Sequence, residues 1–278
     1  MVVTVTAELA EGMASFMIDQ GAPGLMTEDD GEWLRLTAHF AGAPPLAALE
    51  SFAAEICAIF PGAPPPRIET HPVPESDWAE NWKQHFPPIA VGERLFVHPP
   101  WIDAVPSNRA GVVIDPGMAF GTGQHASTRG CLILLERALD SRPGAIVADI
   151  GAGSGILAIA AAKLGASEVW ATDIDPTACR IAADNIRSND VEAVVHVRAS
   201  LEDFPSRVDV IVANLLGGLL IELAPVMRER LRPRGVVIGA GLRTDEEASV
   251  DAAWRAAGFV PVQRYEEDGW VTLMSRRA

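Results

Sequence analysis

The stretch VADIGAGSGILAIAAAKLG, residues 147–165, constrains the fold of this chain more than any other. It passes from a run of apolar, strand-like residues through glycines 151, 153 and 155 into a long apolar segment rich in alanine. Glycines at such a place let the backbone turn tightly and let a ligand approach the main chain at the helix N-terminus. The stretch therefore predicts a buried strand, a glycine turn and a helix, the unit from which open α/β sheets are built.

Further strands and helices alternate after this unit. We expect strands at residues 145–150, 168–174, 193–199, 208–214 and 235–241, and helices that begin near Gly155, Pro176, Leu219 and Asp245. This alternation is typical of a parallel sheet with helices on both faces, a doubly wound, Rossmann-like α/β fold. The last twenty residues predict two strands joined at Asp268-Gly269, so that the sheet ends in an antiparallel hairpin.

The first seventy residues predict a separate, small α+β domain. Strand, helix, strand, strand, helix and strand are expected at residues 2–6, 7–20, 24–28, 32–40, 45–60 and 67–73. This order is that of the ferredoxin-like, split βαβ arrangement. We therefore divide the chain into a ferredoxin-like recognition domain at 1–72, a linker with a short helix and strands at 73–104, and the larger α/β domain at 105–278. In the linker, Trp78 and Trp82 lie four residues apart on one face of the expected helix.

The charge of the chain limits its partners. With 37 acidic and 22 basic residues the net charge is −15, which repels nucleic acid phosphates and argues against direct nucleic acid binding. Residues 1–70 hold ten acids against Arg35 and Arg67, a net charge of −8, so a quarter of the chain carries over half of the excess. This acidic surface is either a solvated face that keeps the protein soluble or a docking surface for a basic partner.

Neither a membrane protein nor a secreted one is expected. The sequence has no run of eighteen apolar residues and no basic, cleavable signal at its start, so we expect a cytoplasmic protein. The three cysteines, Cys57, Cys131 and Cys179, are far apart and form no CxxC pair, which predicts reduced thiols and no zinc site. We expect a monomer.

The glycine turn and the ends of two later strands predict the chemistry of the ligand. The spacing is G-x-G-x-G, with Ile156 where a dinucleotide fingerprint has its third glycine, which favours an adenosine ligand without phosphates over a pyrophosphate. Asp173 follows Gly151 by twenty-two residues, close to the spacing of an acid that binds ribose hydroxyls, whereas Asp175 before Pro176 is better explained as a helix N-cap. A purely structural glycine turn and a turn acid remain the alternatives.

Asn214 ends the expected strand at 208–214 and should face the same crevice as Gly151, because ligands of open α/β sheets bind beyond the carboxyl ends of the strands. Its amide could orient an amine through the carbonyl oxygen while the NH₂ group donates to a neighbour. The alternative is a turn asparagine before Gly217-Gly218.

A second glycine-containing stretch, FGTGQHAST at residues 120–128, precedes another expected helix. It is not a P-loop, because it lacks the G-x-x-x-x-G-K-[ST] spacing. It is a poor metal site, because His125 has no His or Cys at ligand spacing, and we expect no metal.

Taken together, DIGAGSG, Asp173, Asn214 and the terminal hairpin resemble the class I S-adenosylmethionine-dependent methyltransferases over residues 105–278. With DPGMAFGTGQHASTRGCL, TDIDP, VANLL and DWAENWKQHF, nearly the whole chain resembles the ribosomal protein L-eleven methyltransferase (PrmA) family.

The resemblance implies a Rossmann-like methyltransferase sheet, S-adenosyl-L-methionine as cofactor, and lysine or N-terminal amines of ribosomal protein L-eleven, docked on the acidic first domain, as substrate. By motif position it implies that Thr128, Gly151, Asp173 and Asn214 contact the cofactor. We expect Gly153 of the same glycine turn to lie against the cofactor as well, and Phe120, Gly121, Thr122 and Gly123 to form a flexible rim of the pocket that closes over the reacting centre. Asn214, and more weakly His125, are the candidate catalytic residues. The motif at Asn214 is Asn-Leu-Leu-Gly and lacks the prolines and aromatic ring that clamp planar substrates, which favours an aliphatic amine.

Three other interpretations remain. The first is a methyltransferase that acts on another protein or on a small amine. The second is a nicotinamide oxidoreductase, against which Ile156 and the lack of a hydride-transfer dyad both argue. The third is a non-catalytic ribosome-associated protein, which would not need an intact pocket.

Overall fold

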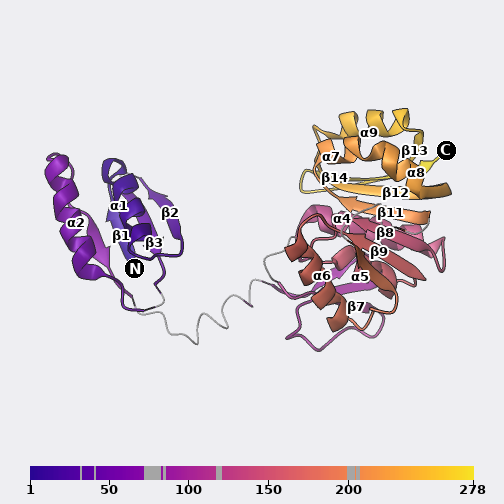
Figure 1. Cartoon of the computed structure of the whole chain (residues 1–278), viewed down its shortest axis with the longest axis horizontal. Helices are drawn as coiled ribbons and strands as arrows, with labels where there is room; N and C mark the ends of the chain where they lie inside the picture. The colour runs from indigo at the N-terminus through magenta and orange to yellow at the C-terminus, as the bar shows by residue number, and fades with distance from the viewer. Residues whose placement is uncertain are drawn as a thin grey trace. The chain divides into compact units, whose positions relative to one another are not determined.

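The structure of the chain is a computed structural model, and it describes residues 1–278 except 32, 41, 72–82, 84–85, 117–120, 199–203 and 205–206. The chain divides into two compact units, Met1–Asn81 and Trp82–Ala278, each of which is described by itself (Figure 1). The expected linker helix with Trp78 and Trp82, and the rim residue Phe120, lie outside the described residues.

The first unit is a four-stranded antiparallel sheet with two helices. Its elements are β1 (Val2–Val5), α1 (Ala7–Asp19), β2 (Leu25–Asp30), β3 (Trp33–Ala38), α2 (Leu46–Ile59) and β4 (Arg67–Glu69), in the order that the sequence predicts. The strands are arranged β2-β3-β1-β4. Alternate residues of β1, Val3 and Val5, are fully buried, and Leu9, Met13 and Leu49 of the two helices join them in one hydrophobic cluster.

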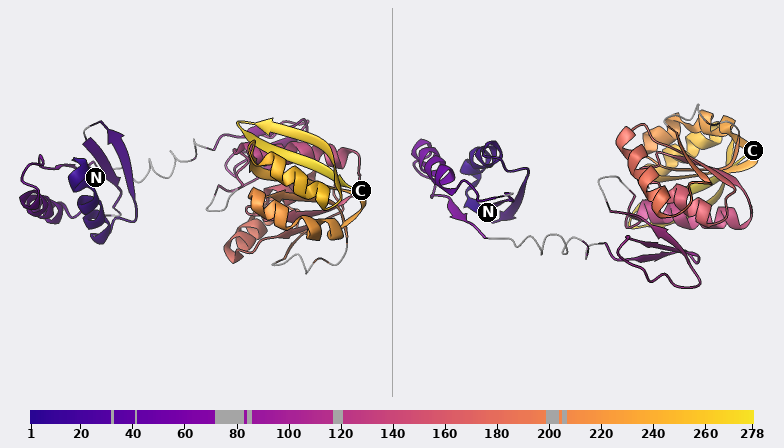
Figure 2. Two further views of the ribbon diagram at one scale, coloured as in Figure 1. Left: turned by 90° about the horizontal axis from the view of Figure 1, so that it is seen from above. Right: turned by 60° about the horizontal axis from the view of Figure 1, so that its bottom comes forward.

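The second unit is built on a seven-stranded sheet in the order β10-β9-β8-β11-β12-β14-β13. Its strands are β8 (Ile146–Ile150), β9 (Glu168–Thr172), β10 (Val195–Arg198), β11 (Val208–Asn214), β12 (Leu231–Arg243), β13 (Phe259–Glu267) and β14 (Trp270–Arg277). The first four strands and β12 run parallel, and β14 is antiparallel to both β12 and β13. The mostly parallel sheet and its terminal antiparallel hairpin confirm the fold expected for this part of the chain (Figure 2).

Helices cover both faces of this sheet (Figure 1). One face packs against α4 (Ala126–Asp140), α5 (Ile156–Lys163) and α6 (Pro176–Ser188), and the other against α7 (Gly217–Glu222), α8 (Ala224–Arg230) and α9 (Glu247–Ala256). Strand residues alternate between the two cores: Val210 and Val212 of β11 face the first, and Ile211 and Ala213 face the second. A central strand apolar on both faces is what a doubly wound sheet requires.

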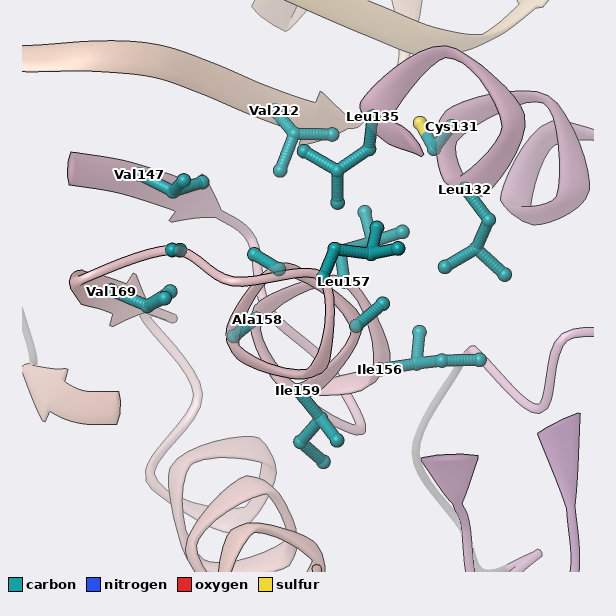
Figure 3. Packing of buried hydrophobic residues seen from close by; sticks show 14 of the residues in the cluster. Cys131, Leu132, Leu135, Val147, Ile156, Leu157, Ala158, Ile159, Val169 and Val212 are labelled. Carbon is teal, nitrogen blue, oxygen red and sulfur yellow. The ribbon is translucent and has the colours of Figure 1, made fainter. Parts of the chain in front are cut away.

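Helix α5 lies at the centre of the first core. Ile156, Leu157, Ala158 and Ile159 are all buried, so this short helix is apolar on every side (Figure 3). Leu132 and Leu135 of α4 pack in the same cluster with Val147 and Val212 from two strands of the sheet (Figure 3). The dense packing fixes the start of α5, and hence the glycine turn that precedes it.

A small third sheet, β5-β6-β7, packs beside this core. It consists of β5 (Ile89–Val91), β6 (Leu95–His98) and β7 (Ala110–Val113); β5 and β6 are antiparallel, and β6 and β7 are parallel. Buried carboxylate oxygens of Glu136 on α4 accept hydrogen bonds from the amides of Glu93 and Arg94 at 2.9 and 3.1 Å. These bonds give the backbone amides of the turn between β5 and β6 hydrogen-bond partners, and they fix this sheet to α4.

Candidate functional site

A cavity of about 610 Å³ lies where β8, β9, β11 and β12 end, the edge at which open α/β sheets bind ligands. Seven of the residues that the sequence assigns to the site line the cavity: Gly121, His125, Thr128, Gly151, Gly153, Asp173 and Asn214. The structure therefore brings together residues that are up to 93 positions apart in the sequence, between Gly121 and Asn214. Thr122 is described but does not line the cavity, and Phe120 lies outside the described residues.

The floor of the cavity is the glycine turn between β8 and α5. Gly151, Gly153 and Gly155 have φ values of 74°, 53° and 80°, in the left-handed region that other residues adopt at a cost. The amides of Gly151 and Ala152 both donate to the carbonyl of Thr172, at 2.8 and 2.9 Å, which fixes the turn against the end of β9. A Cβ atom at Gly151 would lie 2.5 Å from Cδ2 of Leu215. The positive φ is therefore the main reason for a glycine here, and a side chain would in addition require Leu215 to move.

Asp173 lies directly after β9 and is half-buried beside the turn. Its Oδ2 accepts a hydrogen bond from the amide of Gly153 at 2.9 Å, and its Oδ1 accepts one from the amide of Asp175 at 3.0 Å. Each carboxylate oxygen can accept a second hydrogen bond. The side chain is thus held in place by the main chain while it keeps acceptor capacity toward the cavity, which suits a vicinal diol.

The neighbouring Asp175 has a different function. Its Oδ1 accepts a hydrogen bond at 2.8 Å from the amide of Thr177, and Pro176 occupies the first turn of α6. This is the N-cap arrangement that the sequence predicts, and it is confirmed.

Thr128 and Asn214 meet across the cavity. Thr128 lies in the first turn of α4 and is 1% exposed, and Asn214 is the last residue of β11. The amide Nδ2 of Asn214 donates to Oγ1 of Thr128 at 3.3 Å. The carbonyl Oδ1 of Asn214 can accept from a ligand, the second hydrogen of Nδ2 can still donate, and the Thr128 hydroxyl, which accepts from Asn214, can itself donate.

His125 is placed by two structural contacts. It is the N-cap of α4, where Nδ1 lies 3.3 Å from the amide of Ser127 and 2.8 Å from its hydroxyl. Its ring packs edge-on against Trp270, with centroids 4.6 Å apart. The guanidinium of Arg243 lies over the Trp270 ring at 5.7 Å. One wall of the cavity is thus an aromatic pair held by the start of α4 and the start of β14.

The first turn of α4 is tied to the terminal hairpin by an ion pair. Nε of Arg129 donates to both carboxylate oxygens of Glu267, at 3.1 and 3.0 Å, and its Nη1 donates to the carbonyl of Gln124. Because Arg129 follows Thr128 directly, this pair between α4 and β13 fixes the position of the Thr128 hydroxyl.

The segment before α4 is fastened to the glycine turn by Ser154. Its hydroxyl donates to the carbonyl of Gly121 at 2.6 Å, and its own carbonyl accepts from Nδ2 of the buried Asn185 at 2.9 Å. Oδ1 of Asn185 accepts from the amide of Asp115 at 3.2 Å. A continuous chain of hydrogen bonds therefore connects α6, the glycine turn and both ends of the segment between β7 and α4.

Asp149 lies beneath the site, at the end of β8, and is fully buried. Burial raises its pKa to about 7; the hydrogen bond from the amide of Ala158 lowers the pKa, and the charge of Asp173 raises it further. That amide donates to Oδ2 at 3.0 Å, whereas Oδ1 has no hydrogen-bond partner. A proton on this carboxyl at neutral pH avoids a buried, unpaired charge.

The lining of the cavity indicates the class of ligand. Its apolar part comes from side chains on β8, α5, α7, β14 and the segments between elements: Ile150, Ile156, Leu157, Ile174, Leu215, Leu216, Leu219, Leu223 and Trp270. No lysine or arginine is among the described residues that line it, so a pyrophosphate would meet no cationic side chain there. A glycine turn, one carboxylate with free acceptor capacity and an apolar remainder fit an adenosine ligand without phosphates.

Among the residues that the structure describes, no three His, Cys, Asp or Glu side chains are grouped so that they could hold a metal ion. No helix among them is long and apolar enough to cross a membrane.

Sequence reasoning missed three features of the site. Trp270 follows the hairpin turn and carries no local signal of a ligand wall. Gly241 has φ 90°, and a Cβ there would overlap the carbonyl oxygen of Leu215; its only signal was the GAG sequence at the end of β12. Ser154 was seen as part of a glycine motif, and its hydrogen bond to Gly121, 33 residues away, was not foreseen.

Comparison with known proteins agrees with this geometry. Residues 1–278 match the sequence profile of a family described as ribosomal protein L11 methyltransferase (PrmA). A protein named ribosomal protein L11 methyltransferase from Pelotomaculum thermopropionicum is 43% identical over 231 residues, covering 82% of this chain and 74% of the relative. One of the same name from Pelobacter propionicus is 35% identical over 295 residues, covering 99% and 96%.

A solved structure is similar as well. The crystal structure of a ribosomal protein L11 methylase from Lactobacillus delbrueckii subsp. bulgaricus shares 32% sequence identity with this chain and superposes with a TM-score of 0.63. The match covers 69% of this chain and 99% of that one.

Proposed function

This chain belongs to the ribosomal protein L11 methyltransferase (PrmA) family, whose members are S-adenosylmethionine-dependent methyltransferases, and we propose that it methylates amines of ribosomal protein L11. The amines are lysine side chains, the N-terminal α-amine, or both. The observation that carries the proposal is the hydrogen bond of 3.3 Å between Asn214 Nδ2 and Thr128 Oγ1, two residues in the lining of an apolar cavity whose floor is a glycine turn. A cytoplasmic location and a monomeric enzyme are part of the proposal.

The residues that would hold the cofactor are those that line the cavity. Asp173 would accept hydrogen bonds from the ribose hydroxyls, the amides of the turn from Gly151 to Gly153 would lie against the adenosine, and the Thr128 hydroxyl would donate to the methionine carboxylate. Gly121 and Thr122 belong to the rim, which the Ser154 hydroxyl fastens to the turn. From the sequence alone, we propose that Phe120 belongs to the same rim.

S-adenosylmethionine supplies, when bound, a methyl group on a positively charged sulfur that is already a good leaving group. The protein therefore has to align an amine and remove water from it rather than provide a covalent nucleophile. The Asn214 carbonyl oxygen is the group suited to accept a hydrogen bond from the amine, because it is the acceptor of the side-chain amide, and the bond from Nδ2 to Thr128 orients it. His125 caps α4 and packs on Trp270, and we give it a supporting role in the wall of the site.

A lysine of pKa about 10.4 must lose a proton before it can attack. An apolar entrance favours the neutral amine, because desolvation disfavours the charged form. The mouth of the cavity has such a character: Leu216 is 73% exposed, and Leu219 is 42% exposed. Exposed leucines beside Asn214 fit the aliphatic stem of a lysine and leave its amine near the Asn214 oxygen.

The first unit is proposed as the part that recognises the protein substrate. Its strand order β2-β3-β1-β4, with every pair antiparallel, supports the ferredoxin-like assignment for residues 1–72. Glu28 and Asp29 are exposed on β2, an edge strand, in a region that carries a net charge of −8. A basic ribosomal protein would be attracted to this surface, and such steering raises association rates by roughly 10- to 10³-fold.

The proposal is tested by intact-mass spectrometry. The full-length enzyme is incubated with S-adenosylmethionine and unmethylated ribosomal protein L11, and the mass of the substrate should rise in steps of one methylene group. Acetylation of the substrate amines beforehand should abolish the gain. A gain that survives acetylation would show that the target is not an amine, and no gain with L11 but a gain with another protein would refute the substrate assignment.

A further inference from the structure

The edge of the large sheet opposite the cofactor cavity is strongly basic. Parallel strands begin there, so the residues just before β8, β11 and β12 meet at this edge, and the antiparallel β14 ends there. Eight of the chain's 22 basic residues lie in these segments and in the end of α8. We call them the basic edge: Arg142, Arg207, Arg228, Arg230, Arg232, Arg234, Arg276 and Arg277.

Contacts show that these segments are neighbours. Arg142, Arg232 and Arg234 line one polar hollow of about 590 Å³ together with Asp209. The Arg277 guanidinium donates to the carbonyl of Leu231, the residue before Arg232. Residue Val236 of β12 pairs with Arg276 of β14. The arginines therefore form one surface and are not scattered.

Most of these charges are not neutralised. Within the described part of the chain, Arg232 is the one member of the basic edge with a carboxylate partner, Asp209, at 2.9 Å. The side chains of Arg207, Arg234 and Arg276 are exposed and make no hydrogen bond or ion pair with any described residue. Nε of Arg228 is buried without a hydrogen-bond partner. Holding so many like charges together costs free energy, which an anionic partner would recover.

The chain as a whole carries a charge of −15, which disfavours nucleic acid, but the structure separates the charges in space. The first unit, Met1–Asn81, holds 13 acids and two bases, a net charge of −11. The second unit holds 24 acids and 20 bases, a net charge of −4, and eight of its bases form the basic edge. A basic protein substrate would be repelled by this edge, whereas the closely spaced charges of a polyanion would match it. On the proposed function, the substrate is a ribosomal protein, and the polyanion that accompanies such a protein is ribosomal RNA.

We propose that the basic edge binds the phosphate backbone of ribosomal RNA, so that the enzyme can engage its substrate together with RNA. Guanidinium groups suit this task because their planar forks bind phosphate oxygens through two parallel hydrogen bonds. The contact reads no base sequence and is electrostatic, so its affinity falls steeply with salt.

The test uses the full chain and fluorescently labelled large-subunit ribosomal RNA fragments, with binding followed by fluorescence anisotropy. The variant carries Arg207→Gln, Arg234→Gln and Arg276→Gln, three changes at side chains without described partners. The control carries Arg180→Gln, Arg187→Gln and Arg198→Gln, which removes the same charge from α6 and β10. We expect the variant to lose roughly 10-fold or more in RNA affinity and its salt slope to fall by about 2 to 3, whereas the control keeps most of both.

Rates of methyl transfer, measured on free and on RNA-bound substrate, distinguish a failure of this inference from a failure of the proposed function. Both variants should methylate free ribosomal protein L11 at the wild-type rate, and the variant alone should be slower on the protein bound to RNA. Equal RNA affinities for variant and control, or binding to phosphatidylserine vesicles instead of RNA, would overturn the inference. Failure of the wild type to methylate free L11 would overturn the proposed function, and the RNA titration would still decide the role of the edge.

Discussion

Removal of the Asp173 carboxylate tests the cofactor site at its most specific point. The side chain is half-buried, and each of its oxygens already accepts one main-chain hydrogen bond, from Gly153 at 2.9 Å and from Asp175 at 3.0 Å. Two further bonds to a ribose diol would be charge-assisted, and such bonds contribute about 1.5 to 3 kcal/mol each when buried. Discounting for partial exposure, Asp173→Ala should lose about 3 kcal/mol, or roughly 10²-fold in affinity.

The assay is isothermal titration calorimetry with S-adenosylhomocysteine and, separately, with adenine, which has no ribose. The affinity for S-adenosylhomocysteine should fall by the amount above, while the weak affinity for adenine should change little. Asp175→Ala is the matched control: it removes the N-cap bond to Thr177 and should lower stability by about 1 kcal/mol without affecting affinity. Unchanged S-adenosylhomocysteine affinity in Asp173→Ala would refute the assignment of the ribose site. An equal loss for adenine would show that the substitution deforms the glycine turn instead.

Three further predictions concern the surroundings of the site. The folded-state pKa of Asp149, about 7, is above its ordinary value of 3.8, so protonation stabilises the fold at low pH and this contribution is lost as pH rises through 7. The Asp149→Asn variant, which cannot titrate at this position, is the reference. Between about pH 4 and pH 8 the unfolding free energy of the wild type, measured by urea denaturation, should fall by up to about 4 kcal/mol relative to that of the variant. A difference between the two proteins that does not change with pH would contradict this. Gly241→Ala should destabilise the protein by several kcal/mol in the same assay, because φ is 90° and a Cβ would overlap the Leu215 carbonyl, whereas Gly218→Ala, with open space in α7, should be neutral or slightly stabilising. Ser154→Ala removes the 2.6 Å bond to Gly121 and should raise the KM for S-adenosylmethionine roughly 5-fold with little change in Tm; a fall in Tm with unchanged KM would assign Ser154 a purely structural role.

Local patterns were enough to predict much of the second unit. The glycine turn, the N-cap at Asp175 and the hairpin at Asp268-Gly269 depend on residues close together in the sequence, and their positions follow from backbone preferences. Gly151 and Asn214 could be assigned to one edge because parallel strands end on the same side of a sheet, and both line the cavity.

The remaining features depend on contacts between distant segments. No periodicity could show that β5, β6 and β7 form a sheet of their own, or that β12 extends over Leu231–Arg243, well beyond the expected 235–241. In the sequence, Asn185 and Asn189 look like ordinary polar residues of a helix. In the structure, their side chains form hydrogen bonds with backbone groups of Val113 and Asp115, some seventy positions earlier. The basic edge was hidden for a similar reason: net charge sums over the sequence and carries no information about where the charges lie.

The most direct test of the central claim is the thermal unfolding of the full-length protein with two candidate ligands. A ligand present at 100 times its dissociation constant stabilises the folded state by about 2.7 kcal/mol. We predict a clear rise in Tm with S-adenosylhomocysteine, because the glycine turn, Asp173 and the apolar lining suit an adenosine that carries no phosphate, and no rise with NAD at the same concentration. A rise with NAD and none with S-adenosylhomocysteine would contradict the account.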